Sequence, residues 1–319
     1  MKEIIDWDKF VELNWQKKPA LFDLPDEPPM NEFDFLQAVH HLVNGELEAS
    51  PRIRLFADGR NIGPGEEDGL ISFVGTADIR SFAELVDIAT SKLDSDTFTM
   101  ILNDGGKLLP EVKEKLKDFL SSLTERVGVA PSFTDIELFG GSYKNTPFGI
   151  HRDFGNDNFI FGAVGEKRYL LWPPEYFSKE LQENVDFQIK DNLIIASDEA
   201  LAKFKEDALA FTVTPGTFLY MPDWWHVADV QANPIQLTLH LGLYSQVDLP
   251  SLGSIFMSEL LNRRSENTNI EVEYSGEQKE LPSFVSELVS DIKHIVSSGE
   301  LEEHANNWWK TRRKNNGFS

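Results

Sequence analysis

The spacing of apolar residues predicts a mixed α/β beginning for the chain. Apolar positions recur at helical spacing over four segments, which we therefore predict to be helices: 6–16, 31–43, 81–93 and 110–127. Ser81 and Glu84 fit a capping box at the start of the third helix. Two segments rich in β-forming residues, 52–60 and 97–104, are predicted strands.

Short β-rich runs separated by Gly and Pro take over from residue 133, and helical spacing returns after residue 248. The runs are "FTDIELFGG", "NFIFGAV", "EKRYLLW", "ALAFTVT", "TFLYMP" and "PIQLTLHLGLYS". Their short length, and the Gly and Pro residues that separate them, are typical of a sandwich or barrel. Helices are predicted over 250–263, 282–297 and 299–312. We expect an N-terminal α/β segment over 1–130, a β unit over 131–247 and a helical region over 248–319.

Composition restricts the class of protein and its partners. Hydrophobic residues make up 41% of the 319 residues, so the chain can bury a sizeable core. The 30 basic and 53 acidic residues give a formal charge of −23, which disfavours nucleic acid and anionic membranes as partners. Without cysteine, the chain forms no disulfide and no thiolate metal site. It shows no signal peptide and no apolar run of membrane-spanning length, so we expect a cytoplasmic protein.

The segment "FGIHRDFGNDNF" carries a candidate metal site. Residues two apart on a strand point to the same face, so His151 and Asp153 can converge while Arg152 points away. His226, in "MPDWWHVADV", is the candidate for a third ligand from a distant strand. Two imidazoles and one carboxylate suit non-haem Fe(II), because they leave positions free for a cosubstrate and O₂. A hydrogen-bonded surface pair and a core histidine are the alternative interpretations.

Lys167 stands in the otherwise apolar run "KRYLLW". On a strand it shares a face with Tyr169 and Leu171, and one face of this strand must line the interior. If that face is the one with Lys167, the buried ammonium needs an anionic partner. A dicarboxylate cosubstrate would supply it, with one end on the metal and the other on the lysine. The alternative is an edge-strand lysine whose ammonium reaches solvent.

Residues 146–244 resemble the JmjC-type, cupin-like hydroxylases that depend on Fe(II) and 2-oxoglutarate. The motifs that carry the likeness are "HRD" followed by "NFIF", then "GEKRYLLWPP", "GTFLYMPDWWHV" and "LTLHLGLY". Within this family, the likeness is to the protein asparaginyl hydroxylase and to the ribosomal-protein hydroxylases. The segment "NWQKKPALF" resembles the N-terminal motif of the ribosomal-protein hydroxylases. The resemblance implies a mainly β protein with α: a double-stranded β-helix (jelly-roll or cupin) core with an N-terminal α/β elaboration and C-terminal helices.

The resemblance also implies the ligands and a role for each motif. His151, Asp153 and His226 would bind Fe(II), and Lys167 would hold the distal carboxylate of 2-oxoglutarate, with O₂ as the second cosubstrate. The implied activity is hydroxylation of an amino-acid side chain in a peptide, a protein or an amino-acid-derived small molecule. The C-terminal helices are a possible homodimer interface, as in similar hydroxylases.

Five further positions bear on the cosubstrate contacts that the resemblance implies, and two of them, Phe148 and His240, depart from the family pattern. Asn158 and His240 would lie near the metal-chelating end, although the family often has Asn where this chain has His240. The family usually has a hydroxyl-bearing residue three positions before the first histidine, where this chain has Phe148. Thr146 and Tyr143 are the expected substitutes in holding the carboxylate with the lysine.

Two other functional classes remain open at this stage. Cupin-like barrels also carry metal-dependent isomerases and hydrolases that need no cosubstrate. A non-catalytic binding module with a vestigial pocket is the other alternative. Dependence on 2-oxoglutarate distinguishes the first class from the oxygenase, and retention of Fe(II) distinguishes the second.

Overall fold

The computed structural model describes residues 5–24, 27–43, 53–63, 70, 79–130, 134–230, 234–244, 253–254, 256–258, 260 and 283–315. The chain divides into two compact units, residues 1–246 and 247–319. The second contains α10 (Ser283–Ser298) and α11 (Glu300–Asn315), each beginning one residue after its predicted start. The predicted helix over 250–263 lies largely outside the described residues.

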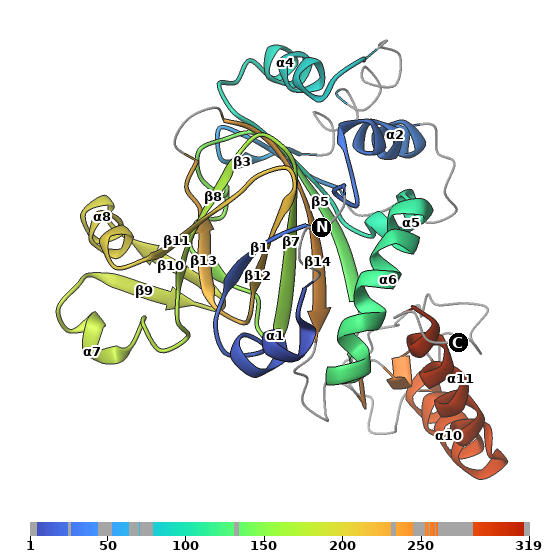
Figure 1. Cartoon of the computed structure of the whole chain (residues 1–319). Helices are drawn as coiled ribbons and strands as arrows, with labels where there is room; N and C mark the ends of the chain where they lie inside the picture. Colours follow the sequence, from blue (N-terminus) through green and yellow to red (C-terminus); the bar gives the residue numbers. More distant parts are fainter. Residues whose placement is uncertain are drawn as a thin grey trace. The chain divides into compact units, whose positions relative to one another are not determined.

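Eight strands of the first unit form a double-stranded β-helix (Figure 1). They are β5 (Thr134–Ser142), β6 (His151–Arg152), β7 (Asn156–Val164), β8 (Lys167–Trp172), β11 (Leu209–Val213), β12 (Thr217–Met221), β13 (Trp225–Ala228) and β14 (Ile235–Tyr244). One sheet has the order β12-β7-β14-β5 and the other β11-β8-β13-β6, with antiparallel neighbours throughout. The chain thus crosses repeatedly between two facing sheets, which is jelly-roll topology. The predicted fold class is confirmed.

Further strands extend both sheets. The large sheet gains β1 (Ala20–Asp23) beside β12, and β4 (Phe98–Leu102), β2 (Ile53–Ala57) and β3 (Arg60–Asn61) beyond β5. The small sheet gains β10 (Leu193–Ala196) and β9 (Phe187–Lys190) beyond β6. The sequence pattern does not predict β1, β9 or β10. Each has four residues and is ordered by the strand edge that it joins rather than by its own spacing.

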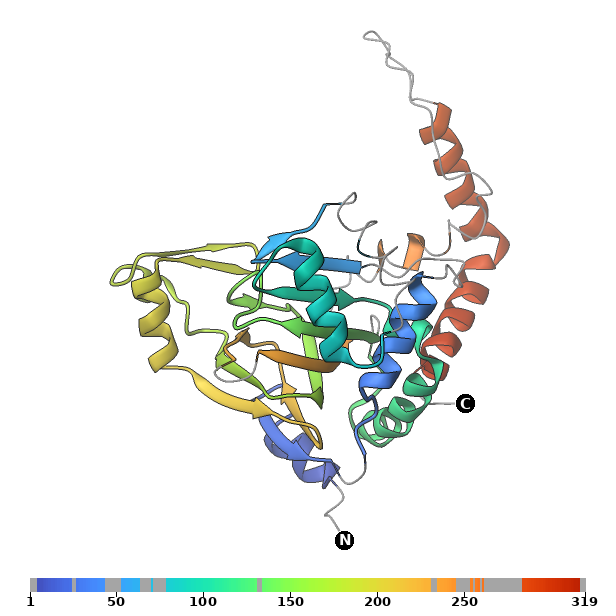
Figure 2. The same cartoon turned by 90° about the horizontal axis from the view of Figure 1, so that it is seen from above.

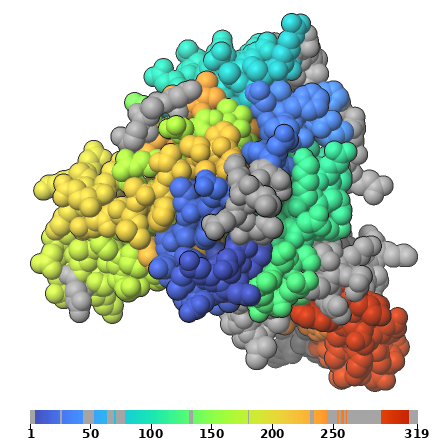
Figure 3. All heavy atoms as spheres, viewed as in Figure 1, coloured from blue at the N-terminus to red at the C-terminus, as the bar shows by residue number. Residues whose placement is uncertain are grey.

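Helices cover the outer face of the large sheet (Figure 1 and Figure 2). They are α1 (Trp7–Leu13), α2 (Glu32–Val43), α4 (Phe82–Leu93), α5 (Gly105–Leu108) and α6 (Pro110–Val127). Phe119 of α6 meets three phenylalanines of the sheet edge-on at 5.3–5.5 Å between ring centroids: Phe159, Phe161 and Phe218. Helices and sheet therefore share one apolar core. Figure 3 shows α1 and α6 next to each other at the surface of this face.

The outer face of the small sheet packs against α7 (Lys179–Gln182) and α8 (Asp198–Glu206). Trp172 and Trp225 lie in this second apolar cluster, and Nε1 of Trp172 donates to the carbonyl oxygen of Phe204 at 2.8 Å. Since Trp225 points outward into this core, its neighbour His226 points into the barrel.

The space between the two sheets is lined partly by apolar and partly by polar side chains. The apolar part is a small cluster: Ile160, Tyr169, Leu171, Val213, Leu219 and Met221. Histidines, asparagines and one lysine occupy the remainder, although these residue types are rarely buried without a partner. A functional site is expected among these polar side chains, because stability alone would favour apolar side chains there.

Candidate metal centre

Two histidines and one aspartate converge inside the barrel, where β6 and β13 lie side by side. His151 is the cross-strand partner of His226, and their ring centroids are 4.0 Å apart. Asp153 follows β6 directly and places Oδ2 at 3.9 Å from Nε2 of His226. One potential ligand atom from each residue lies within 4.8 Å of the other two. The structure thus brings together the three residues that the sequence pattern selects.

Backbone carbonyls orient both imidazoles. Nδ1 of His151 lies 2.9 Å from the carbonyl oxygen of Gly149, and Nδ1 of His226 lies 3.1 Å from that of Trp224. Because a carbonyl oxygen only accepts, each Nδ1 is assigned the hydrogen and each Nε2 is left with a lone pair. Burial lowers the pKa of both imidazoles, so both rings are neutral near pH 7. Neutral rings fixed through Nδ1 have the form that metal ligation requires.

Asparagines of β7 hold Asp153 in place. Nδ2 of Asn158 donates to Oδ2 of Asp153 at 3.2 Å, and Nδ2 of Asn156 donates to Oδ1 of Asn158 at 3.1 Å. Burial acts to raise the pKa of Asp153, but His226, His151 and the Asn158 hydrogen bond outweigh it and hold the pKa below its usual value. Asp153 is therefore an ionised carboxylate whose direction Asn158 sets.

Replacing Asn158 with alanine is expected to weaken metal binding by about 10- to 100-fold, the range typical of groups that orient a ligand. The metal ligands themselves stay in place, so binding should persist at higher metal concentration. Titration of Co(II) into the apoprotein measures the change. Gln188→Ala, at an exposed position of β9, is the control. Equal affinity of Asn158→Ala and wild type would show that Asp153 does not depend on this hydrogen bond.

An ion pair fixes β6 relative to the turn before β13. Arg152 points away from the metal site, as the strand alternation predicts, and its Nε and Nη2 lie 2.5 and 3.0 Å from the two carboxylate oxygens of Asp223. Oδ2 of Asp223 also accepts from the backbone N–H of Gly155 at 3.1 Å. This bidentate contact ties the segment of His151 to the segment of His226 and so fixes the separation of the two rings.

Lys167 extends into the same interior from β8. It is only 3% exposed, and its Nζ lies 3.4 Å from Oγ1 of Thr238. The ring centroids of Phe139, Tyr143 and Tyr169 surround Nζ at 5.0–5.5 Å. No carboxylate of the described residues forms an ion pair with this ammonium. Burial lowers the pKa of Lys167 to about 7, which leaves a site that favours an incoming anion.

His240 lies beside Lys167 in the interior of the barrel. Its ring stacks on Phe139 with centroids 4.2 Å apart, and burial lowers its pKa well below the usual value. Nε2 of His240 lies 3.1 Å from the hydroxyl of Tyr169 and 3.2 Å from that of Thr238. A neutral imidazole and two hydroxyls thus lie next to the ammonium inside the barrel.

The hydroxyl that contacts Lys167 belongs to Thr238, and neither expected substitute takes this position. Thr146 instead accepts a hydrogen bond from the backbone N–H of Ala228 at 2.9 Å. Tyr143 presents the face of its ring to Nζ of Lys167. Phe148 lies edge-on against His151, with ring centroids 4.5 Å apart.

Comparison with known proteins gives structural neighbours only. No family model and no curated protein matches the chain. The structure is similar to YcfD, a ribosomal oxygenase from Escherichia coli, in complex with cobalt and 2-oxoglutarate: 15% identity, TM-score 0.49, covering 97% of this chain and 70% of that one. The YcfD complex with cobalt and succinic acid is 14% identical, with a TM-score of 0.48, and the match covers 97% of this chain and 70% of that one. An X-ray structure of E. coli YcfD is 15% identical, with a TM-score of 0.47, and the match covers 97% of this chain and 71% of that one.

At 14–15% identity, the chemistry of this chain has to be inferred from its own side chains. Two neutral imidazoles and one ionised carboxylate form the donor set that suits Fe(II) and leaves coordination positions open. The ammonium of Lys167 lies in the same interior, where it fits the far carboxylate of a metal-chelating dicarboxylate. The residues present therefore fit both Fe(II) and 2-oxoglutarate.

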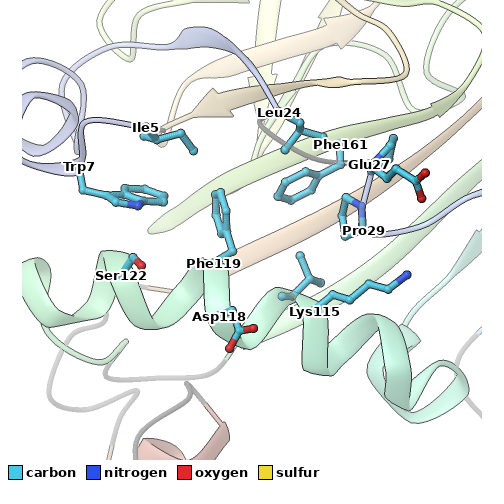
Figure 4. A pocket seen from close by; sticks show the side chains of 12 residues that line it. Ile5, Trp7, Leu24, Glu27, Pro29, Lys115, Asp118, Phe119, Ser122 and Phe161 are labelled. Carbon is cyan, nitrogen blue, oxygen red and sulfur yellow. The ribbon is translucent and has the colours of Figure 1, made fainter. Parts of the chain in front are cut away.

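One cavity of the first unit lies away from the metal centre (Figure 4). Its volume is about 740 Å³, and it lies on the outer face of the large sheet, where Trp7, Phe119 and Phe161 line it. Its lining is mainly apolar, and it holds none of the metal-site residues.

Among the described helices, none has both the length and the apolar character needed to cross a membrane.

Proposed function

We propose that this protein is an Fe(II)- and 2-oxoglutarate-dependent oxygenase that hydroxylates an amino-acid side chain in a peptide, protein or amino-acid-derived small molecule. One observation carries the proposal: a buried ammonium that contacts a hydroxyl but no carboxylate of the described residues shares the barrel interior with a two-histidine, one-carboxylate cluster. In a metal-dependent enzyme without a cosubstrate, such an ammonium would have no anion to bind, and a buried ammonium without an anionic partner destabilises the protein.

The protein groups divide the work of binding and positioning. His151, Asp153 and His226 would hold Fe(II), and Lys167 with Thr238 would hold the far carboxylate of 2-oxoglutarate. Bound together, Fe(II) and 2-oxoglutarate supply the activation of O₂, with oxidative decarboxylation of the cosubstrate to succinate. The aromatic rings around Nζ of Lys167 would keep water away from a carboxylate bound there. A cytoplasmic location and a dimer through the C-terminal helices stay predictions.

The test is O₂-dependent conversion of 2-oxoglutarate to succinate by wild-type protein loaded anaerobically with Fe(II). We expect succinate above the protein-free rate and none after chelation of the metal. Binding of 2-oxoglutarate to the Co(II)-loaded protein, followed by the visible spectrum, provides a second measurement without turnover. Protein that retains Fe(II) but neither binds nor consumes 2-oxoglutarate would be a cosubstrate-independent enzyme, and protein that retains no metal would be a binding module.

A further inference from the structure

The cavity on the outer face of the large sheet, here called the outer cavity, lies between α6 and the N-terminal segment (Figure 4). Its floor includes Leu116 and Phe119 of α6 and Phe161 of β7. Leu24 and Pro29 line it on the side away from the helix. Its volume of about 740 Å³ falls within the range of small-molecule sites, which are mostly apolar with a few polar groups that orient the ligand.

One end of the outer cavity carries two hydrogen-bond donors that have no acceptor. Trp7 is only 8% exposed and packs edge-on against Phe119, with ring centroids 5.0 Å apart. Among the described residues, none accepts a hydrogen bond from the indole N–H of Trp7 or from the hydroxyl of Ser122, which lines the same end. Because a buried indole N–H usually has an acceptor, this end of the cavity favours a ligand oxygen.

The arginine beside these donors is already paired with a carboxylate. Arg126, one turn beyond Ser122 on α6, places Nε at 2.6 Å from Oδ1 of Asp8, and its Nη1 donates to the backbone carbonyl oxygen of Ser122 at 2.8 Å. A ligand carboxylate buried here would face uncharged donors and would lose much of its hydration. A neutral carbonyl oxygen loses less hydration, and its two lone pairs match the two donors.

The other end of the outer cavity carries charges of both signs. Lys115 and Glu27 line it, both are exposed, and neither forms an ion pair with a described residue. Asp118 also belongs to the lining, but Figure 4 shows its carboxylate pointing away from the cavity. This end therefore attracts neither anions nor cations selectively, and an uncharged chain can lie between the two side chains.

The separation of the two ends matches a chain of medium length. Lys115 and Ser122 are seven residues apart on α6, which corresponds to about 10 Å along the helix axis. Phe119 lies between them on the same helix, and Phe161 lines the same floor. An extended chain of about eight carbons is about 9 Å long, so it would cover both aromatic rings.

We propose that the outer cavity binds a neutral medium-chain acyl compound, an amide or an ester. Its carbonyl oxygen accepts from Trp7 and Ser122, and its chain lies over Phe119 and Phe161. Each methylene group that leaves water for the cavity strengthens binding by up to about fourfold, so the chain supplies most of the affinity. The site shares no residue with the metal centre, and the inference does not depend on the proposed oxygenase function.

NMR of the full-length protein, labelled with ¹⁵N in its tryptophans, tests the site. The probes are octanamide, octanoate, octylammonium and acetamide, each at up to about 5 mM, a weak-binding range. We expect octanamide to bind with a Kd of about 1 mM or tighter and to shift the indole N–H resonance of Trp7. Octanoate and octylammonium should bind at least about tenfold more weakly, because each buries a charge without a partner. Acetamide, which lacks the chain, should cause no shift.

Two variants remove one donor each. Trp7→Phe keeps an aromatic ring and also assigns the resonance, and Ser122→Ala removes only the hydroxyl. Each should weaken octanamide binding about three- to tenfold, the range for one lost hydrogen bond, as measured by saturation-transfer NMR on the ligand. The matched controls are Trp309→Phe, at an exposed position of α11, and Ser121→Ala, on α6 but outside the cavity lining. Both controls should bind as wild type does.

The inference is overturned if octanamide does not bind, or if it binds without shifting the Trp7 resonance, which would be adventitious binding elsewhere. Affinity for octanoate or octylammonium equal to that for octanamide also overturns it. So does wild-type affinity in Ser122→Ala, or an equal loss in the matched controls. The remaining indole resonances report whether Trp7→Phe is folded, and Ser122→Ala alone decides if it is not.

Discussion

Asp153→Ala is expected to retain no Fe(II) at micromolar metal and to produce no succinate above background. The substitution removes the only charged ligand, and even groups that merely orient a ligand contribute about 10- to 100-fold to affinity. We therefore expect a loss in metal affinity of at least about a hundredfold. Metal content after anaerobic loading and desalting, together with the succinate assay, measures both effects.

Two further variants sharpen this result. Asp153→Asn keeps the shape and the neutral oxygen but loses the charge, so intermediate metal affinity is expected. Asp186→Ala removes an exposed carboxylate and should behave as wild type. If Asp153→Ala retains one equivalent of Fe(II), or turns over 2-oxoglutarate at the wild-type rate, the carboxylate is not a ligand and the proposed function fails.

The metal cluster shows which kind of site a sequence reveals. His151 and Asp153 are two apart, and His226 follows an apolar run that must be a buried strand, so alternation alone aims all three side chains inward. The structure reaches the convergence by a different local route. β6 ends at Arg152, and Asp153 lies in the turn that follows, where Asn158 and not the strand pleat sets its direction.

The inner end of the pocket was less predictable, because it depends on the pairing of strands distant in sequence. Thr238 is two residues before His240, and Tyr169 is two after Lys167, so alternation places each pair on one face. It does not give the register that brings β14 and β8 together around one ammonium. The inward direction of Asp135 and Glu137 on β5 could not be predicted for the same reason. The segment "TDIEL" alternates like any half-exposed strand, and only its pairing with β14 shows which face points into the barrel.

Replacing Lys167 with methionine is expected to weaken 2-oxoglutarate binding by at least about thirtyfold while leaving metal binding intact. Methionine fills a similar volume but cannot pair with a carboxylate, and loss of one partner of a buried charge pair costs about 2–5 kcal/mol. Titration calorimetry of 2-oxoglutarate into Mn(II)-loaded protein measures the change. An unchanged affinity would show that the carboxylate is bound elsewhere.

Without 2-oxoglutarate, the same substitution should stabilise the protein. Because burial lowers the pKa of Lys167 to about 7 from the 10.5 of an exposed lysine, the folded protein binds fewer protons than the unfolded chain between these values. The stability of the wild type therefore rises with pH across that window. Lys167→Met should be more stable by about 1–4 kcal/mol below pH 7, with the difference shrinking toward pH 10.5.

Above pH 7, binding of 2-oxoglutarate should also be accompanied by uptake of a proton by Lys167. The free ammonium is mostly deprotonated at pH 8.5, and pairing with a carboxylate restores its charge, so the affinity for 2-oxoglutarate falls as pH rises above about 7. Calorimetry at pH 8.5 in two buffers of different ionisation enthalpy counts the proton. Lys167→Arg is the matched control, since a guanidinium stays charged and takes up none. Identical apparent enthalpies in both buffers for the wild type would mean that Lys167 is already charged before the ligand arrives.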